Sequence, residues 1–207
     1  MITRNTTRSP MRERILDAAD NLLARYGYQK TTDDDLAREA GIGRRTIYIH
    51  FTNKEEIFLA SIDRVIERLL SELRRLATTS DTPDKKLTHI LVARVLFRMD
   101  SVHNYHLSLD DMFAVLRPAY LERRERYFTN EAHVLAEVIT EGQRIGIFTP
   151  SPALDTARTL LLATNSLLPY SLSGRELGSR EDIERKARAI AQLVLRGLLR
   201  HDTKHTA

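Results

Sequence analysis

The chain has 207 residues, a formal net charge of +4 and no cysteine. Without cysteine, neither a disulfide framework nor a thiolate-based metal or redox site is possible. No segment approaches the roughly 18 consecutive apolar residues that a membrane-spanning helix needs, and the first residues lack the apolar core of a secretory signal. We therefore expect a soluble, cytoplasmic protein.

The chain opens with a polar segment, residues 1–9, which we expect to be a flexible basic arm. Ser9 followed by Pro10 is typical of a helix start, because serine caps the free N–H groups and proline already has a helical φ. Apolar residues then recur at helical spacing until Gly27, which predicts a first helix. Its apolar face consists of Ile15, Ala18, Ala19, Leu22, Leu23 and Tyr26.

A second helix is predicted to open at Thr32. Thr32 and Asp35 have the spacing of a capping box, in which each side chain satisfies a free backbone N–H group. Leu36 and Ala40 then lie on one apolar face, and Gly41 can take the left-handed conformation that ends a helix. The sequence therefore predicts a short helix followed by a tight glycine turn.

A third helix is predicted over residues 44–51, after an apolar plug at Ile42. Ile47 and Phe51 are four positions apart and should face inward. The opposite face carries cationic, hydroxyl and apolar side chains. Side chains of these types contact phosphates and base edges in a major groove. This face consists of Arg44, Arg45, Thr46, Tyr48, Ile49 and His50. The pattern indicates a helix-turn-helix that binds double-stranded DNA.

The charge distribution favours the same interpretation. Residues 1–54 hold 10 Lys and Arg against 7 Asp and Glu, whereas residues 55–207 hold 22 against 21. A basic excess beside the motif is expected of a nucleic-acid-binding unit. Arg4 and Arg8 of the arm could lie in an adjacent minor groove. The aspartates at positions 33 and 34 carry the opposite charge and should repel nearby phosphates.

The rest of the chain is predicted to be helical. Asn53 and Glu56 repeat the capping signature, so Lys54 lies in the first turn of a long helix and could reach a phosphate. No segment alternates with strand periodicity. Further helices are expected over residues 84–99, 107–116, 118–141, 151–168 and 180–201. The predicted fold class is all-α.

These residues resemble the TetR family of transcriptional regulators. Members share a threonine that opens the second helix, an Ala-Gly turn, and a T-[LI]-Y-x-H-F stretch followed by lysine. This chain has Thr32, Ala40 and Gly41, residues 46–51, and Lys54 at those places. Gly43 departs from the family pattern, because a serine-like cap is usual there.

The resemblance implies a division into an arm (1–9), a helix-turn-helix DNA-binding domain (10–54) and a helical ligand-binding and dimerisation domain (55–207). It also implies a homodimeric repressor released from a palindromic operator by a small effector. Contacts to the DNA backbone are expected from Thr46, Tyr48, His50 and Lys54, and Thr32 is also expected to bind DNA. Contacts to bases are expected from Arg44, Arg45 and Ile49.

The C-terminal part resembles family members that respond to acyl-CoA or other lipid-like molecules. The similarity includes the EGQRIGIF stretch at residues 141–148 and LVLRGL at residues 193–198. An apolar cavity with one polar anchor is typical of a small-molecule site. Candidate lining residues are Phe97, Met112, Phe113, Tyr127 and Asn165. The alternative is that this aromatic and methionine stripe is ordinary core.

The last two helices are predicted to form a four-helix contact between two copies, as the resemblance also implies. Gly197 within a good helix suggests close backbone approach. The interface residues are expected to be Leu160, Leu161, Thr164, Leu167, Leu168, Ile190, Leu193, Val194, Gly197 and Leu198. An intramolecular core is the alternative for part of this set.

Two other functions remain open. A helical sensor or scaffold could have lost DNA binding, and the aspartates at 33 and 34 favour this. A metal-dependent helical enzyme could use His103 and His106 together with Asp100, Asp110 and Asp111. Catalytic motifs such as a nucleophile elbow or a phosphate loop are missing from the sequence, so we expect neither an enzyme nor a cofactor.

Overall fold

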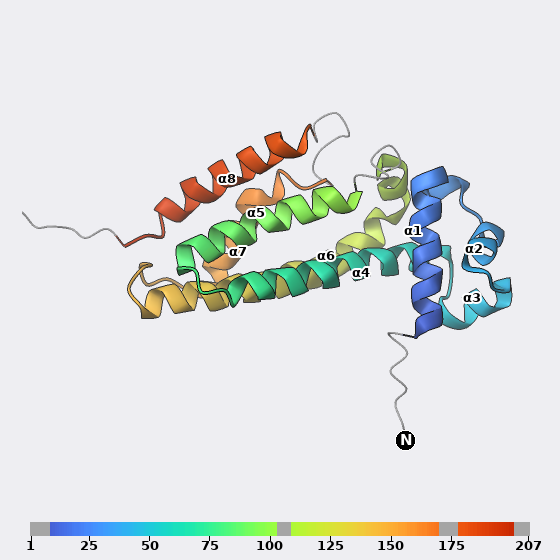
Figure 1. Cartoon of the computed structure of the whole chain (residues 1–207), viewed down its shortest axis with the longest axis horizontal. Coiled ribbons are helices and arrows are strands. Elements are labelled where there is room, and N and C mark those ends of the chain that lie inside the picture. The colour runs from blue at the N-terminus through green and yellow to red at the C-terminus, as the bar shows by residue number, and fades with distance from the viewer. Residues whose placement is uncertain (1–8, 103–108, 170–177, 201–207) are drawn as a thin grey trace, which may run out of the picture. The chain divides into compact units, whose positions relative to one another are not determined.

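The computed structural model describes residues 9–102, 109–169 and 178–200, and every named element within these ranges is an α-helix (Figure 1). The predicted all-α fold is therefore confirmed. The helices are α1 (Pro10–Lys30), α2 (Asp33–Ala40), α3 (Arg44–His50), α4 (Lys54–Ala77), α5 (Pro83–Val102), α6 (Leu109–Arg144), α7 (Ala153–Asn165) and α8 (Arg180–Arg196). None of them is long and apolar enough to span a membrane.

The chain forms two compact units. The first contains residues 1–67 and 102–122, and the second contains residues 68–101 and 123–207. Helices α4 and α6 thus contribute residues to both units. The functional boundary expected after residue 54 stays a prediction.

Several helix boundaries differ from the sequence analysis. Helix α8 ends at Arg196 with Gly197 as its C-cap, not at about residue 201. Gly27 does leave the helical conformation, with φ 76° and ψ 172°, but one further turn follows it and α1 ends at Lys30. The two helices expected on either side of Arg117 are a single helix, α6, with Pro118 inside it. Proline removes the helical hydrogen bond to the carbonyl four residues earlier. Pro118 and Ala114 are both exposed, so water can reach that carbonyl and the helix continues.

The first unit has a core built from the inward faces of α1 to α4. Ser9 caps α1 by accepting a hydrogen bond from the backbone N–H of Arg12 at 3.2 Å, as predicted. Tyr28 and Phe58 pack edge to face with ring centroids 5.0 Å apart. Fully buried side chains in this core include Ile15, Leu16, Leu36, Ile47, Ile57 and Phe58.

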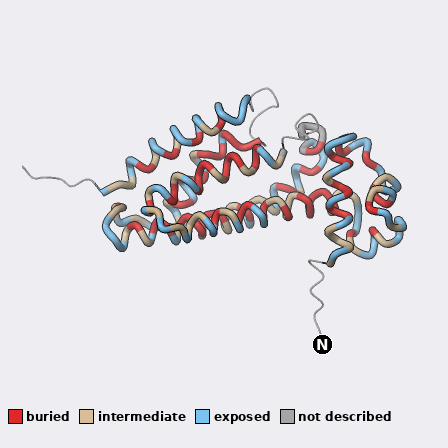
Figure 2. The backbone as a smooth tube through the Cα atoms, viewed as in Figure 1, coloured by how far each residue is buried: buried red, intermediate tan, exposed pale blue. Residues whose placement is uncertain are grey.

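The second unit has its own core, and buried positions recur at helical spacing along α5, α6 and α7 (Figure 2). One cluster joins α4, α5, α6, α7 and α8 and includes Leu73, Leu87, Leu135, Ile139, Leu161 and Leu195. A second cluster joins α5 to α8 and to the turn after α7, and includes Val95, Met99, Leu168, Ile183 and Ala187. Helices α7 and α8 are thus anchored in this unit by their own buried residues.

Candidate nucleic-acid interface

Helix α2 begins and ends where the sequence predicted. The Thr32 hydroxyl accepts a hydrogen bond from the Asp35 backbone N–H at 3.1 Å, and the Thr32 N–H donates to Asp35 Oδ2 at 3.0 Å. This capping box lowers the pKa of Asp35, because the charged carboxylate accepts hydrogen bonds from Thr32. Gly41 ends α2 in the left-handed region at φ 62°. The geometry fixes where the chain turns toward α3.

Arg14 of α1 holds the turn in place. Its guanidinium donates to the Ala40 carbonyl oxygen at 2.7 Å, which satisfies an acceptor at the end of α2. Helix α3 then starts at Gly43 without a side-chain cap, as the missing serine predicted. Its orientation must therefore come from packing rather than from capping.

That packing is supplied by Ile47 and Phe51, which are 0% and 3% exposed. With these two side chains inward, α3 turns its opposite face to solvent. Tyr48 is 42% and Ile49 72% exposed. We call this surface the recognition face; it consists of Arg44, Arg45, Thr46, Tyr48, Ile49 and His50, of which Thr46 and His50 are half-buried.

Two donors of the recognition face contact an acidic side chain of α2. The Tyr48 hydroxyl donates to Asp33 Oδ2. Arg44 Nη2 lies 3.3 Å from the same oxygen, and Arg44 Nη1 lies 3.6 Å from Asp34 Oδ1. The hydrogen bond to Asp33 raises the pKa of Tyr48, because it stabilises the protonated phenol. Sequence analysis noted the aspartates but did not predict these contacts.

Lys54 forms contacts that sequence analysis did not predict. Its ammonium donates to the carbonyl oxygens of Tyr28 and Thr31 at 3.1 and 2.8 Å, and it lies 4.5 Å from the centroid of the Tyr28 ring. Burial lowers the pKa of Lys54, since desolvation disfavours the charged form. Lys54 thus connects the first turn of α4 to the end of α1 with two of its three donors, and its contact with a phosphate stays a prediction.

Replacing Lys54 by methionine is expected to lower the free energy of unfolding by about 1 to 2 kcal/mol, because two carbonyl oxygens lose a charged donor. Urea unfolding of the DNA-free protein measures this effect. Lys30→Met is the matched control, because Lys30 is exposed. Unchanged stability of Lys54→Met, combined with weakened DNA binding, would instead support the original phosphate contact.

A second connection between α1 and α4 is made by Arg64, which is 8% exposed. Its guanidinium donates to Glu13, Asp17 and Asp20 at 3.0, 2.7 and 2.7 Å. Burial alone would lower the pKa of Arg64, but the three carboxylates outweigh it and raise the pKa. The first helix of the motif is thus fixed to α4 by a charged network that sequence analysis missed.

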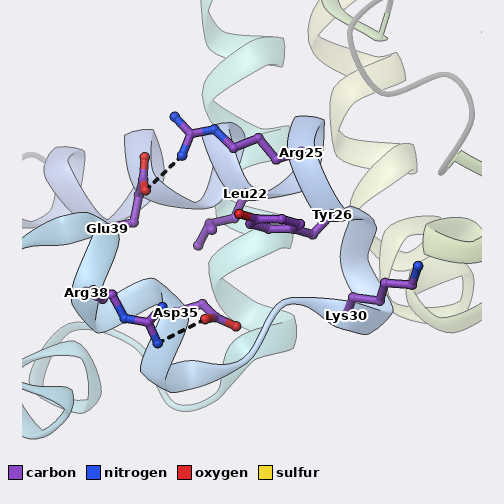
Figure 3. Close-up of a pocket in the computed structure, with 7 residues that line it drawn as sticks. All are labelled: Leu22, Arg25, Tyr26, Lys30, Asp35, Arg38 and Glu39. Atoms are coloured by element: carbon purple, nitrogen blue, oxygen red, sulfur yellow. Dashed lines mark hydrogen bonds and ion pairs between the residues drawn. The ribbon is translucent and has the colours of Figure 1, made fainter.

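A shallow hollow of about 220 Å³ lies between α1 and α2. Two ion pairs line it, Arg25 with Glu39 at 3.2 Å and Arg38 with Asp35 at 3.3 Å (Figure 3). Tyr26, predicted to belong to the apolar face of α1, is 55% exposed here. The charged walls make this hollow unsuitable for an apolar effector.

The predicted ligand residues have different environments. Phe97 lines an open groove of about 640 Å³ beside Ala93 and Leu96. Tyr127 is buried in the second unit, whereas Met112 is buried in the first. The side chain of Phe113 lies outside the described residues. The effector site therefore stays a prediction.

Asn165 belongs to a buried polar network in the second unit. Arg94 donates to Asn165 Oδ1 at 2.8 Å and to Thr164 Oγ1 at 3.0 Å, and it also donates to Glu131. Arg98 donates to the other oxygen of Glu131. The sequence signal was available, because two arginines four positions apart interrupt the apolar face of α5.

The residues expected at the dimer interface fall into two groups. Those of α7 and the turn after it are buried within the single chain, so they already serve as core, the alternative that the sequence left open. This group contains Leu160, Leu161, Thr164, Leu167 and Leu168. Those near the end of α8, namely Ile190, Leu193, Val194, Gly197 and Leu198, are half-buried or exposed.

Each of these two helices carries an accessible apolar side chain. Leu162 of α7 is 60% exposed and Leu193 of α8 is 71% exposed. Leu193 lies on the surface that the sequence predicted at the interface, whereas Leu162 was not predicted there. A dimer contact through α7 and α8 would have to use side chains of this kind, because the predicted α7 set is enclosed.

The proposed metal ligands cannot be placed. His103 and His106 lie outside the described residues, as do the side chains of Asp110 and Asp111 and the arm before Ser9. Asp100 is described, and it forms an ion pair with Arg180 at 3.0 Å. In the described part of the chain, no group of three or more His, Cys, Asp or Glu side chains could hold a metal ion.

The capped α2, the glycine turn and the anchored α3 define a helix-turn-helix unit of the DNA-binding class. The family model for bacterial regulatory proteins of the tetR family matches residues 15–61, which include this unit. Residues 15–61 are therefore similar to the tetR family of bacterial regulatory proteins, as the resemblance indicated.

Individual relatives are regulators too. An uncharacterised regulator of Bacillus subtilis, YhgD, is 36% identical over 92 residues, which are 44% of this chain and 46% of the relative. This match thus spans about half the length of YhgD. The fatty acid metabolism regulator protein of the same organism is 25% identical over 162 residues, which are 75% of this chain and 79% of the relative.

Solved structures share the whole fold. A transcriptional regulator from Cytophaga hutchinsonii superposes with a TM-score of 0.76 at 22% identity, covering 91% of this chain and 98% of the other. FadR from Bacillus subtilis, solved in complex with stearoyl-CoA, superposes with a TM-score of 0.69 at 17% identity. The match covers 90% of this chain and 98% of FadR. At these identities the likeness concerns the fold alone.

Proposed function

We propose that this chain is a homodimeric repressor whose two recognition faces bind the half-sites of a palindromic operator. The observation that carries the proposal is the orientation of α3: Ile47 and Phe51 hold it inward, so cationic and aromatic side chains face solvent. Two such helices bind successive major grooves when they lie about 34 Å apart.

The roles within the recognition face follow from chemistry. Hydroxyl and imidazole groups of Thr46, Tyr48 and His50 suit phosphate oxygens, which position a protein on DNA. Arg44 and Arg45 have the fork geometry that reads guanine, and Ile49 suits a thymine methyl group. The Thr32 hydroxyl donates its single hydrogen to Asp35 Oδ2 at 2.6 Å, so Thr32 must release this carboxylate before it can donate to a phosphate.

We further propose that a small amphiphilic effector of the acyl type releases the operator. Support comes from the similarity to a fatty acid metabolism regulator and from the fold shared with FadR. Helix α4 carries residues of both units, so an effector that prefers one arrangement of the second unit can act on the first. A coupling of about 1 to 3 kcal/mol is typical of such regulation.

Selection of bound duplexes from a random pool tests the proposal. The full chain should enrich an inverted repeat with half-sites about one helical turn apart, and binding should weaken as salt rises. Repeating the selection with acyl-CoA thioesters present tests the effector. Enrichment of no sequence at low salt would contradict the proposal.

The dimer can be tested separately. Leu193→Asp places a charge on an apolar side chain that is 71% exposed. We expect it to shift the chain from dimer to monomer in sedimentation equilibrium, because an unpaired charge in a helix–helix contact is strongly unfavourable. Ile145→Asp, at an exposed apolar position outside α7 and α8, is the control. If Leu193→Asp remained dimeric, α8 would not form the interface through this face.

A further inference from the structure

Asp33 occupies donors that DNA would need. It is the first residue of α2, next to α3 (Figure 1), and its side chain is 23% exposed. Its Oδ2 oxygen accepts the Tyr48 hydroxyl and lies 3.3 Å from Arg44 Nη2. Both partners belong to the recognition face, so one carboxylate engages two candidate DNA contacts.

The Tyr48 hydroxyl cannot serve two acceptors at once. A tyrosine hydroxyl has a single hydrogen, so Tyr48 must release Asp33 before it can donate to a phosphate. In Arg44, one terminal nitrogen contacts Asp33 and the other lies 3.6 Å from Asp34. Each terminal nitrogen has a second hydrogen, so Arg44 keeps donor capacity, but the two carboxylates compete with a base edge for the same guanidinium.

We propose that Asp33 is an internal competitor of the DNA backbone, which mimics a phosphate and lowers the affinity of the recognition face for DNA. This inference rests on the proposed DNA binding and adds a residue that limits it. Arg45 is exposed, forms no ion pair within the described part of the chain and can make first contact. Arg44 and Tyr48 then exchange Asp33 for DNA acceptors.

Competition fits this geometry better than support of a base-reading arginine. A supporting carboxylate would hold Arg44 alone. Asp33 also accepts the hydrogen bond that the Tyr48 hydroxyl would otherwise donate to a phosphate. Its charge would also lie close to phosphates in the complex and repel them. The nearby ammonium of Lys54, held by the Tyr28 and Thr31 carbonyl oxygens, does not remove this charge.

Asp33→Asn tests the inference. The Thr32–Asp35 capping box remains, so the variant should fold. We expect it to bind duplex DNA about 3- to 10-fold more tightly than wild type at low salt, since exposed charge contacts are individually modest. Asp34→Asn is the matched control: it removes the same charge without the Tyr48 contact, and should improve binding by about 2-fold or less.

A double-mutant cycle separates competition from simple charge removal. In a Tyr48→Phe background, the gain from Asp33→Asn should shrink toward that of Asp34→Asn. Without DNA, NMR titration of Tyr48 should show a lower pKa in Asp33→Asn than in wild type, because the hydrogen bond to the carboxylate is lost.

The outcomes are distinguishable. If wild type binds DNA and Asp33→Asn binds no more tightly than Asp34→Asn, this inference is overturned while the proposed function stands. An unchanged Tyr48 pKa would also overturn it. If neither wild type nor any variant binds any duplex, the proposed function fails, and this inference fails with it.

Discussion

Glu131→Ala is expected to lower the free energy of unfolding by about 3 to 5 kcal/mol, because it leaves buried guanidinium groups without their shared carboxylate. Glu131 is 0% exposed and Arg94 is 1% exposed. Glu131 accepts hydrogen bonds from both Arg94 and Arg98, and Arg94 continues the network to Thr164 and Asn165. The network thus joins α5, α6 and α7 in the interior of the second unit.

Urea unfolding followed by circular dichroism measures this effect. Glu137→Ala is the matched control, since Glu137 lies on the same helix but is exposed. A loss below about 1 kcal/mol for Glu131→Ala would contradict the role assigned to the network.

The stability that Glu131 contributes is expected to depend on pH. Burial alone would raise the pKa of Glu131, but Arg94 and Arg98 outweigh it and hold the pKa below its ordinary value of 4.5. A depressed folded-state pKa stabilises the protein at pH above the unfolded value, and this stability is lost as pH falls through the folded value. Glu131→Gln should therefore lose less stability than wild type between neutral and acid pH.

Arg45→Ala is expected to weaken operator binding by about 10- to 100-fold and to relax sequence preference at one position of each half-site. Arg45 is exposed on the recognition face, and its side chain forms no ion pair within the described part of the chain. Unlike Arg44, Arg45 contacts no carboxylate in the described part of the chain that would compete with a base. Its full interaction energy with DNA should therefore be visible in the variant.

Fluorescence anisotropy with the selected operator and with single-base variants measures both effects. Arg144→Ala, at an exposed arginine in the last turn of α6, is the control for a lost positive charge. Equal loss of affinity for operator and random duplex would assign Arg45 to phosphate contact. No loss at all would remove it from the interface.

The helix-turn-helix could be predicted from sequence because its signals are local. Thr32 and Asp35 cap within one turn, Gly41 needs only its own backbone freedom, and Ile47 and Phe51 reveal the buried face by spacing. Local signals also explain why α6 was wrongly predicted as two helices. A proline such as Pro118 usually ends a helix. The sequence alone did not reveal that Pro118 and Ala114, four residues earlier, are both exposed.

The remaining features depend on contacts between distant residues. Lys54 was assigned to phosphate by resemblance, yet it meets carbonyl oxygens 26 and 23 positions earlier in the chain. The enclosed leucines of α7 could not be separated from the exposed Leu162 by periodicity alone, because the choice of inward side depends on the neighbouring helices. Asp33 was recognised as a charge but not as the partner of Tyr48, 15 positions away.

Directed DNA cleavage from α3 tests the central claim most directly. The chain contains no cysteine, so Ile49→Cys creates a single thiol on the recognition face for attachment of an iron chelate. On the selected operator we predict two symmetric sets of cuts, one in each half-site and centred in successive major grooves. Absence of localised cuts, or the same pattern from Arg144→Cys, would contradict the claim that α3 lies in the groove.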